Sequence, residues 1–418
     1  MKIYNRKNNF EGLEVFGLAD IEESLREARM NLRNFTYIQI IEEWSKIGQK
    51  IIKDKDLISR EGVLYLARWL RKENLLNFIV DSLGGNLEGD FIKLRAGGEM
   101  IAQPRGIVVH WTAGNTITFP IIALAQSTIV KNSSIMRASK NNLEFTIKVM
   151  KIINNLNSPL SKILLDNITI VYFPHEEIEN HIILSKIADC KAIWGGSKTI
   201  RTLKNLPEKD NCENIIFGPK YSMAVIDRDS QFSDELRDNL DKLALDIIAF
   251  DQMACSSPQI IFIEKGGLEL GAVAEILSAS LSKLSLKYPK RLIREDIASK
   301  IVIKRCEFLL DPSLDLISSK ENDWSILVGG EVKLEEAIQS RTVFIKEINQ
   351  LEDIAKLINP KIQTVCMIAE KSRKKLLAKN YFYNGVARCV PPGETNYYDW
   401  PWDGMNVLSR LVRWCRLS

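Results

Sequence analysis

One short stretch of the chain combines a thiol with small and polar neighbours. Residues 251–259 read Asp-Gln-Met-Ala-Cys-Ser-Ser-Pro-Gln, with the thiol at Cys255. An amphipathic segment at 233–250 precedes this stretch, and the apolar run at 260–263 predicts a strand after it. A cysteine presented at the edge of a strand would expose its sulfur to a substrate carbonyl, with the thiolate as the attacking species. Cys255 is therefore a candidate nucleophile, with a small buried apolar residue as the alternative.

The same stretch resembles the active-site signature of the acyl-CoA reductases of the LuxC type, a branch of the aldehyde dehydrogenase superfamily. Residues 340–345, residues 362–365 and the Trp-Asp-Gly turn at 402–404 also resemble this family. The resemblance implies that Cys255 is the nucleophile and that the fold is α/β and aldehyde dehydrogenase-like. It also implies a long-chain fatty acyl thioester as substrate, whereas the residues are equally compatible with an aromatic or polyketide acyl group.

The composition of the chain favours some classes of protein over others. The 418 residues are 45% apolar and 26% charged, which is typical of a globular protein with two domains. Net charge is +4, from 57 basic and 53 acidic residues, which is too evenly mixed to indicate a nucleic-acid partner. No 18-residue apolar run predicts a membrane span, and the N-terminus lacks the core of a signal peptide. The seven cysteines form no CxxC pair and the three histidines have no metal-ligand spacing, so we expect reduced thiols in the cytoplasm and no metal site.

Periodicity predicts four consecutive regions. They are a helical N-terminal segment at 1–95, an α/β domain at 96–230, a smaller α/β unit with Cys255 at 231–385, and a C-terminal segment at 386–418. The resemblance implies that 96–230 is an NADP-binding domain on which the first segment packs, and that 231–385 is the catalytic domain. In the second region strands and helices alternate, which predicts a doubly wound parallel sheet whose sixth strand is 222–226. The aromatic C-terminal segment, with a helix at about 405–414, is expected to wall an acyl pocket or to contact a second subunit in a homo-oligomer.

Candidate catalytic residues follow the first predicted strand of this sheet, at the end where such sheets bind ligands. The carboxamide of Asn115 could donate a hydrogen bond to an oxyanion on the substrate carbonyl. Its place is similar to that of the asparagine in the superfamily's Pro-Trp-Asn motif, although Pro120 lies farther along the chain than in that motif. An asparagine that only caps the turn is the alternative. His110, at the end of the strand, is a candidate for moving protons, with a structural histidine as the alternative.

Basic residues follow the second strand. The superfamily has Lys-Pro-Ser-Glu at the matching place, where it holds the adenosine ribose. Here Arg137 replaces the lysine, Ser139 remains and Lys140 replaces the glutamate. A carboxylate would pair with a free 2′-hydroxyl, whereas cations suit a 2′-phosphate. The sequence therefore predicts NADPH rather than NADH as cofactor, with a solvated basic edge as the alternative.

Glycines follow the fourth strand. The turn Gly195-Gly196-Ser197 resembles the Thr-Gly-Ser turn of the superfamily. Glycines at a strand-to-helix turn let backbone amides approach a pyrophosphate at the helix N-terminus. A Gly-Gly pair is a weak signal without this context, and there is no GxGxxG here. We therefore expect these residues to bind the cofactor.

A carboxylate is missing where hydrolytic aldehyde dehydrogenases carry Glu-Leu-Gly-Gly-Lys. Residues 215–220 read Ile-Ile-Phe-Gly-Pro-Lys, so no glutamate is placed to activate water. The sequence predicts NADPH-dependent reduction of an acyl thioester, from acyl-CoA or an acyl carrier, to the aldehyde through an S-acyl-cysteine and a thiohemiacetal. The alternatives are aldehyde oxidation in the CoA-acylating direction, and a non-reducing protein that transfers acyl groups with a partner in a complex.

Overall fold

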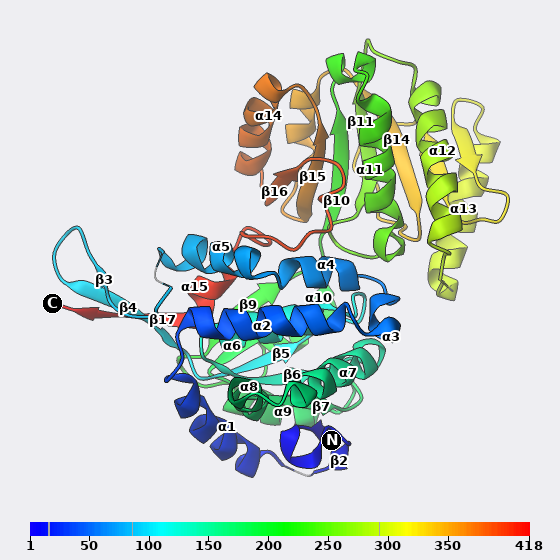
Figure 1. Ribbon diagram of the computed structural model, residues 1–418. Coiled ribbons are helices and arrows are strands. Elements are labelled where there is room, and N and C mark those ends of the chain that lie inside the picture. The colour runs from blue at the N-terminus through cyan, green and yellow to red at the C-terminus, as the bar shows by residue number, and fades with distance from the viewer. Residues whose placement is uncertain (16, 86, 292) are drawn as a thin grey trace. The chain divides into compact units, whose positions relative to one another are not determined.

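The computed structural model of the chain describes residues 1–15, 17–85, 87–291 and 293–418 (Figure 1). The chain forms two compact α/β units. The first unit contains Met1–Gly218 and Tyr398–Ser418, and the second contains Pro219–Tyr397. This division differs from the expected boundaries at 230/231 and 385/386, because the first unit is completed by the last residues of the chain.

The first unit is built on a seven-stranded sheet in the order β2-β1-β7-β6-β5-β8-β9. Its parallel strands are β5 (Ile107–Trp111), β6 (Ser133–Arg137), β7 (Ile168–Tyr172), β8 (Cys190–Trp194) and β9 (Glu213–Phe217). Numbered along the chain, these five strands lie in the order 3-2-1-4-5, so the order reverses between β5 and β8. This is the doubly wound parallel sheet that the alternating pattern predicted, and such a reversal marks the crevice where these sheets bind ligands.

Helices connect the parallel strands. They are α6 (Phe119–Ile129), α7 (Lys140–Leu156), α8 (Pro159–Asp166), α9 (Ile178–Ile187) and α10 (Ser197–Lys204). Helix α6 starts with a proline in its first turn and is buried along nearly its whole length, which explains its almost uninterrupted apolar sequence. Helix α8 was not predicted, because it follows α7 after a two-residue break that the apolar periodicity does not mark.

The N-terminal segment is only partly helical. Its helices are α1 (Ala19–Leu32), α2 (Tyr37–Ile51), α3 (Lys55–Ile58), α4 (Val63–Trp69) and α5 (Lys72–Leu83). It also contains β1 (Lys2–Tyr4), which pairs antiparallel with β7, and β2 (Leu13–Glu14), which pairs antiparallel with β1 at the edge of the first sheet. Strands this short have too few residues to show an alternating pattern, so the mostly helical pattern of residues 1–95 did not reveal them.

Three strands of the first unit form a separate antiparallel sheet in the order β17-β4-β3. Strands β3 (Ile92–Lys93) and β4 (Glu99–Pro104) extend as a ribbon beside the C-terminal strand β17 (Val412–Leu417), as Figure 1 shows. The predicted final helix at 405–414 is therefore wrong in its second half. Only α15 (Val407–Leu411) is helical, and the residues after it pair with β4.

The second unit has its own seven-stranded sheet in the order β12-β13-β14-β11-β10-β15-β16. Its strands are β10 (Tyr221–Ile226), β11 (Pro258–Glu264), β12 (Asp315–Ser318), β13 (Ser325–Val328), β14 (Thr342–Ile348), β15 (Ile362–Ile368) and β16 (Arg388–Val390). Strand β10 was expected as the sixth strand of the first sheet but pairs with β11 and β15. Its residues 223–226 are buried alternately in the two cores of the second unit, so both of its faces are covered there.

Helices cover both faces of the second sheet. One core contains side chains of α11 (Leu236–Ile248) and α12 (Leu270–Lys287). The other contains side chains of α13 (Glu295–Leu310), the 3₁₀ helix η4 (Leu351–Lys356) and α14 (Lys371–Tyr383). A second 3₁₀ helix, η3 (Ala249–Gln252), follows α11 directly and leads to Cys255. Because helices cover both faces, the ends of the strands, rather than the faces of the sheet, are available to ligands.

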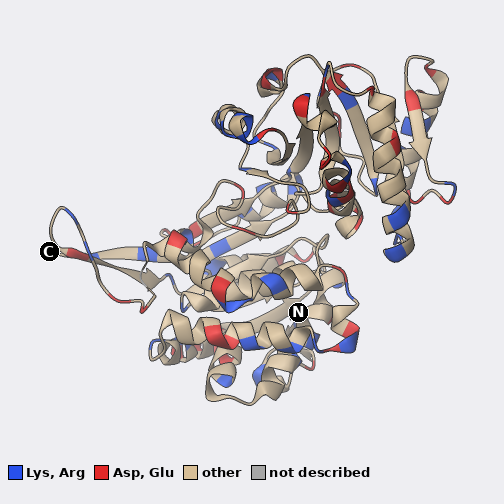
Figure 2. Ribbon diagram, turned by 45° about the horizontal axis from the view of Figure 1, so that its top comes forward, with Lys and Arg blue, Asp and Glu red and all other residues tan. Residues whose placement is uncertain are grey.

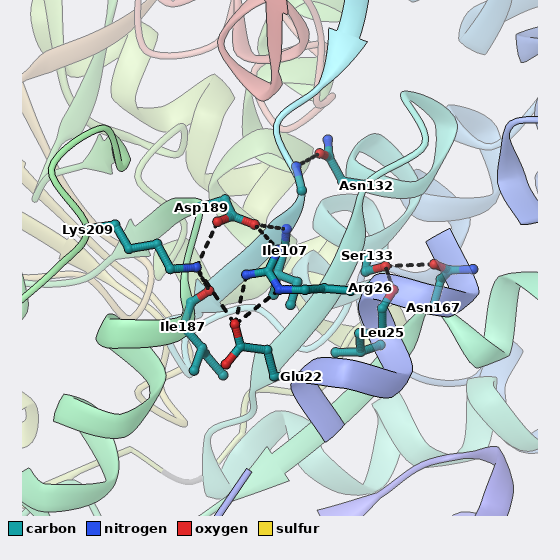
Figure 3. Close-up of polar contacts among 11 residues, drawn as sticks. Glu22, Leu25, Arg26, Ile107, Asn132, Ser133, Asn167, Ile187, Asp189 and Lys209 are labelled. Carbon is teal, nitrogen blue, oxygen red and sulfur yellow. Dashed lines mark hydrogen bonds and ion pairs between the residues drawn. The ribbon is translucent and has the colours of Figure 1, made fainter. Parts of the chain in front are cut away.

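A charged cluster ties α1 to the amino ends of the strands in the first unit (Figure 3). Asp189 accepts a hydrogen bond from the Ile107 backbone N–H at 2.8 Å and pairs with Arg26 and Lys209 at 3.1 and 2.8 Å. Gly106 has φ of 140°, and a Cβ there would lie 2.1 Å from Asp189 Oδ2. These contacts lie at the edge of the sheet opposite the carboxyl ends of its strands, so they stabilise the unit without contributing to a ligand site.

Lys and Arg are interspersed with Asp and Glu along the helices of both units (Figure 2). Within the described ranges, no helix is long and apolar enough to cross a membrane.

Candidate active site

Cys255 lies in the turn between η3 and β11, at the amino edge of the second sheet. Its side chain is half-buried, so the sulfur is not sealed in apolar packing. The carboxamide of Gln363, at the start of β15, donates a hydrogen bond from Nε2 to Cys255 Sγ at 3.3 Å. Ser222, at the start of β10, donates from Oγ to the Cys255 carbonyl oxygen at 2.8 Å. Three neighbouring strands therefore hold the proposed nucleophile.

The backbone before Cys255 takes a strained path. Phe250, Asp251 and Gln252 have φ angles of 57°, 48° and 61°, in the left-handed region. Such a conformation costs about 1–2 kcal/mol for each non-glycine residue. Gln252 offsets part of this cost, because its side chain donates to the Pro258 carbonyl at 2.7 Å and accepts from the Thr342 N–H at 2.7 Å. The turn that carries the thiol is thus fixed by hydrogen bonds rather than by local preference.

A second left-handed segment holds the first one. Gln339, Ser340 and Arg341 have φ angles of 70°, 53° and 60°, directly before β14. Arg341 forms an ion pair with Asp251 at 2.6 Å, and the two side chains are only 2% and 6% exposed. The Gln339 N–H donates to Gln259 Oε1 at 3.3 Å. The polar residues that flank Cys255 in its sequence motif therefore fix the loop, and Arg341 and Thr342 of the motif at 340–345 contact that loop.

The two serines after Cys255 hold the segment 391–397. Asn396 Oδ1 accepts hydrogen bonds from Ser256 Oγ at 2.8 Å and from Ser257 Oγ at 3.2 Å. Asn396 also donates from Nδ2 to the Asp246 carbonyl at 2.9 Å. The Asp246 carboxylate accepts from the Gly393 N–H at 2.7 Å, and burial raises its pKa to about 7. The nucleophile loop is thereby linked to the end of α11 and to the last segment of the second unit.

In the first unit, the three strand ends singled out from the sequence come together. Trp111, the last residue of β5, is in register with Arg137 of β6 and with Ile193 of β8. Asn141, in the first turn of α7, donates to the Gly114 carbonyl at 3.3 Å, which brings the loop after β5 to the start of α7. Asn115 is exposed in this loop. The carboxyl edge of the first sheet therefore gathers these residues at the reversal of strand order.

Arg137 gives this edge its positive charge. It donates from Nη2 to the Phe173 carbonyl at 2.9 Å, and its guanidinium lies 5.5 Å from the centre of the Phe173 ring. Among the described residues its buried Nε has no hydrogen-bond partner. Burial lowers the pKa of Arg137, although an arginine guanidinium stays charged in proteins. Ser139 is the N-cap of α7, and Lys140 is the exposed first residue of this helix. Two cations therefore flank the strand end: Arg137, which is held by a hydrogen bond, and Lys140, which is exposed to solvent.

The glycine turn after β8 leaves room above α10. Gly196 is the N-cap of α10 with φ of −71°, so its backbone conformation does not require glycine. A Cβ at Gly196 would meet no atom within 4 Å, whereas one at Gly195 would lie 3.2 Å from Thr199. Ser197 opens the helix. Free backbone N–H groups at this open helix end suit the pyrophosphate of a dinucleotide.

Comparison with known proteins identifies the family. The profile of the family described as Acyl-CoA reductase (LuxC) matches residues 30–414. The chain belongs to the LuxC family. Two similar proteins are the long-chain acyl-protein thioester reductases of Vibrio harveyi and Aliivibrio fischeri, which are 27% and 25% identical over 326 residues. These alignments cover 75% of this chain and 64% of each relative, so the chain spans less than two thirds of their length.

Solved structures show the same fold. A putative aldehyde dehydrogenase from Burkholderia cenocepacia has a TM-score of 0.70 at 13% identity, covering 98% of this chain and 93% of that one. The NADP-dependent glyceraldehyde-3-phosphate dehydrogenase from Bacillus halodurans, complexed with NADP, has a TM-score of 0.69 at 13% identity, covering 100% and 95%. The predicted aldehyde dehydrogenase-like α/β fold and the resemblance to the LuxC type are both confirmed.

The stretch that lacks the hydrolytic glutamate is apolar in this LuxC-family chain. Residues 213–217 form β9, and the Phe217 ring stacks on Trp194 with centroids 4.4 Å apart. Aromatic packing therefore occupies the carboxyl end of this strand.

His110 does not lie where a proton carrier was expected. It is the second-last residue of β5, it is 1% exposed, and its ring stacks on Trp194 at 6.1 Å. Burial lowers its pKa to about 3. A histidine with this pKa is neutral near pH 7 and is a weak base, so the structure favours the structural alternative for His110.

Four of the other cysteines are poorer candidates for the nucleophile than Cys255, because burial disfavours their thiolates. Burial raises the pKa of Cys190 and Cys366, and it raises the pKa of Cys212 to about 11 and that of Cys389 to about 12. Cys306 is exposed on α13. Sequence reasoning did not single out Gln363 within the motif at 362–365, although its carboxamide stands in a mostly apolar strand.

Proposed function

We propose that this chain reduces an acyl thioester to an aldehyde, with Cys255 carrying the acyl group between the two half-reactions. The observation that supports this most directly is the half-buried Cys255 sulfur, which accepts a hydrogen bond from Gln363 in a loop fixed by buried polar contacts. The similar proteins from Vibrio harveyi and Aliivibrio fischeri are named long-chain acyl-protein thioester reductases, which supports the same substrate class.

In the first half-reaction the Cys255 thiolate attacks the thioester carbonyl carbon. A new carbon–sulfur bond forms, and the electron pair of the C=O bond moves onto oxygen. Backbone amides near Cys255 are our candidates for donating hydrogen bonds to that oxyanion. The bond to the original thiol then breaks, the departing thiolate takes up a proton, and Cys255 keeps the acyl group.

In the second half-reaction the S-acyl group becomes an aldehyde. A bound nicotinamide cofactor supplies the hydride that this reduction requires. The resulting thiohemiacetal on Cys255 collapses when its carbon–sulfur bond breaks, which releases the aldehyde and returns the thiolate. The sequence supports reduction over hydrolysis, because residues 215–220 have no glutamate where hydrolytic relatives carry one to activate water.

The cofactor we propose is NADPH. The carboxyl edge of the first sheet fits a dinucleotide phosphate, because Arg137 has a buried Nε without a partner among the described residues and Gly196 leaves open space at a helix N-terminus. Arg137, Ser139 and Lys140 would hold the 2′-phosphate. Gly195, Gly196 and Ser197 would hold the pyrophosphate.

Mass spectrometry of the Cys255 peptide tests the proposal. We expect a long-chain acyl thioester to leave an acyl adduct on Cys255, and NADPH to discharge it as aldehyde faster than NADH does. Cys255→Ala should form neither adduct nor aldehyde, whereas Cys306→Ala, which removes the exposed thiol of α13, should behave as the unmodified chain. Aldehyde formation by Cys255→Ala would refute the covalent route, and equal use of NADH would refute the cofactor assignment.

A further inference from the structure

The start of β15 departs from regular strand geometry beside the nucleophile. Ile362 and Val365 are three residues apart, yet both side chains belong to the same core, which strict alternation in a strand does not allow. The pairing of β10 with β15 shifts register between Tyr221 and Met223, and the pairing of β10 with β11 shifts between Ser222 and Met223. Such irregularities redirect side chains and are frequent next to active sites.

The residues at this irregularity contact Cys255. Ser222 uses its hydroxyl twice, donating to the Cys255 carbonyl at 2.8 Å and accepting from the Thr364 N–H at 3.1 Å. Gln363 is fully buried and directs its Nε2 at the Cys255 sulfur. A buried carboxamide costs free energy unless it is hydrogen-bonded, and an apolar side chain would suit the strand Ile-Gln-Thr-Val-Cys-Met-Ile better. The irregular start of β15 therefore places the Gln363 carboxamide against the Cys255 sulfur.

We propose that Gln363 is a catalytic residue that stabilises the thiolate of Cys255. A carboxamide N–H is a donor to sulfur, and a hydrogen bond to a charged acceptor is stronger than one to the neutral form. The donor therefore favours the S⁻ state over the S–H state. The same contact fixes the direction of the sulfur, since Gln363 is held within β15 while Ser222 holds the Cys255 carbonyl.

This role rests on the proposed function and adds to it. Each turnover needs a thiolate before acylation, and release of the aldehyde regenerates that thiolate. No proton is exchanged with Gln363, because the carboxamide only donates a hydrogen bond. The proton of the Cys255 thiol must leave to solvent or to another group before attack.

The test measures the thiolate directly, without reductase turnover. Iodoacetamide alkylation of Cys255, followed by peptide mass spectrometry over a range of pH, reports the fraction of thiolate. We expect Gln363→Met, which keeps the length of the side chain but removes the donor, to lower the alkylation rate of Cys255 near pH 7 about tenfold, corresponding to a midpoint about one pH unit higher. Gln363→Glu should raise the midpoint further, because a carboxylate adds negative charge.

Two controls separate this role from a structural one. Cys306, exposed on α13, is alkylated in the same samples and should keep its midpoint in every variant. Thr342→Val removes a buried hydroxyl that has no hydrogen-bond partner among the described residues, and it should leave the Cys255 profile unchanged. A Gln363→Met profile that matches the unmodified chain would overturn the proposal, even if aldehyde formation were lost.

If the Gln363 variants do not fold, a titration of Cys255 in the unmodified chain still tests the proposal. Its Cys255 thiolate, followed by ultraviolet absorbance relative to Cys255→Ser, should titrate below the ordinary cysteine value of about 8.5. A midpoint at or above that value would overturn the proposal. Failure of the acyl adduct to form, with the alkylation midpoints as expected, would instead refute the reductase function and leave the role of Gln363 in place.

Discussion

At the scale of single residues, the motif around Cys255 contains one reactive group and several side chains that hold the loop. The thiol is the group that can react, whereas the aspartate, glutamines and serines of the motif hold the backbone around it. Asp251 pairs with a buried arginine, and Gln252 and Gln259 bond backbone groups. A motif can therefore be recognisable in sequence although most of its side chains never meet substrate.

Asp246 should make the stability of the second unit depend on pH. Burial raises its folded-state pKa to about 7, whereas an unfolded aspartate titrates near 3.9. Between these values the folded chain holds a proton that the unfolded chain has lost. Its stabilising contribution is therefore complete below about pH 4 and is lost as the pH rises to about 7. The loss is at most about 4 kcal/mol.

Urea unfolding of Asp246→Asn tests this effect. The asparagine resembles the protonated acid and keeps an acceptor for the Gly393 N–H. Relative to this variant, the unmodified chain should lose free energy of unfolding between about pH 4 and about pH 7 and lose no more above it. A constant difference across this range would contradict the raised pKa.

At the scale of elements, two left-handed segments hold each other through one buried ion pair. Neither segment contains glycine, and nothing in residues 250–252 or 339–341 predicts this conformation. The strands on either side were predictable because their apolar runs are long and bounded by turns. The turn between η3 and β11 was not, because its geometry depends on partners some 90 residues away in the chain.

Arg341→Met should destabilise the second unit strongly. It leaves the buried Asp251 carboxylate paired with the partly exposed Arg291 at 2.7 Å, and breaking a buried pair costs about 3–5 kcal/mol. The matched control is Arg294→Met, whose pair with Asp296 is exposed and should cost less than about 1 kcal/mol. Similar urea midpoints for the two variants would contradict a supporting role for the ion pair.

At the scale of the whole molecule, the chain returns to its first unit after completing the second. The sequence predicted the doubly wound sheet and a second α/β unit from the alternation of strands and helices. It did not predict that residues 398–418 complete the first unit, because this depends on contacts between distant parts of the chain, such as the antiparallel pairing of β17 with β4. Pairing between strands so distant in sequence leaves no mark in local periodicity.

Removal of residues 398–418 should therefore destabilise the first unit selectively. The deletion removes the whole of β17, and it removes Leu408 and Leu411, which are buried. It also removes the Leu411 carbonyl that accepts from Asn132 Nδ2 at 2.9 Å, which leaves a buried amide unpaired. The second unit ends at Tyr397 and keeps all of its strands.

Hydrogen exchange distinguishes the two units in one sample. We expect the truncated chain to lose protection in β4, β5 and β6 while β10, β11 and β15 keep theirs, because local stability follows local contacts. Asn132→Ala in the full-length chain removes the hydrogen bond to the Leu411 carbonyl but keeps β17. It should therefore reduce protection at the start of β6, and by less than the deletion does. Equal loss of protection in both sheets would show that the units unfold together, and the selective role of the C-terminal residues would then be wrong.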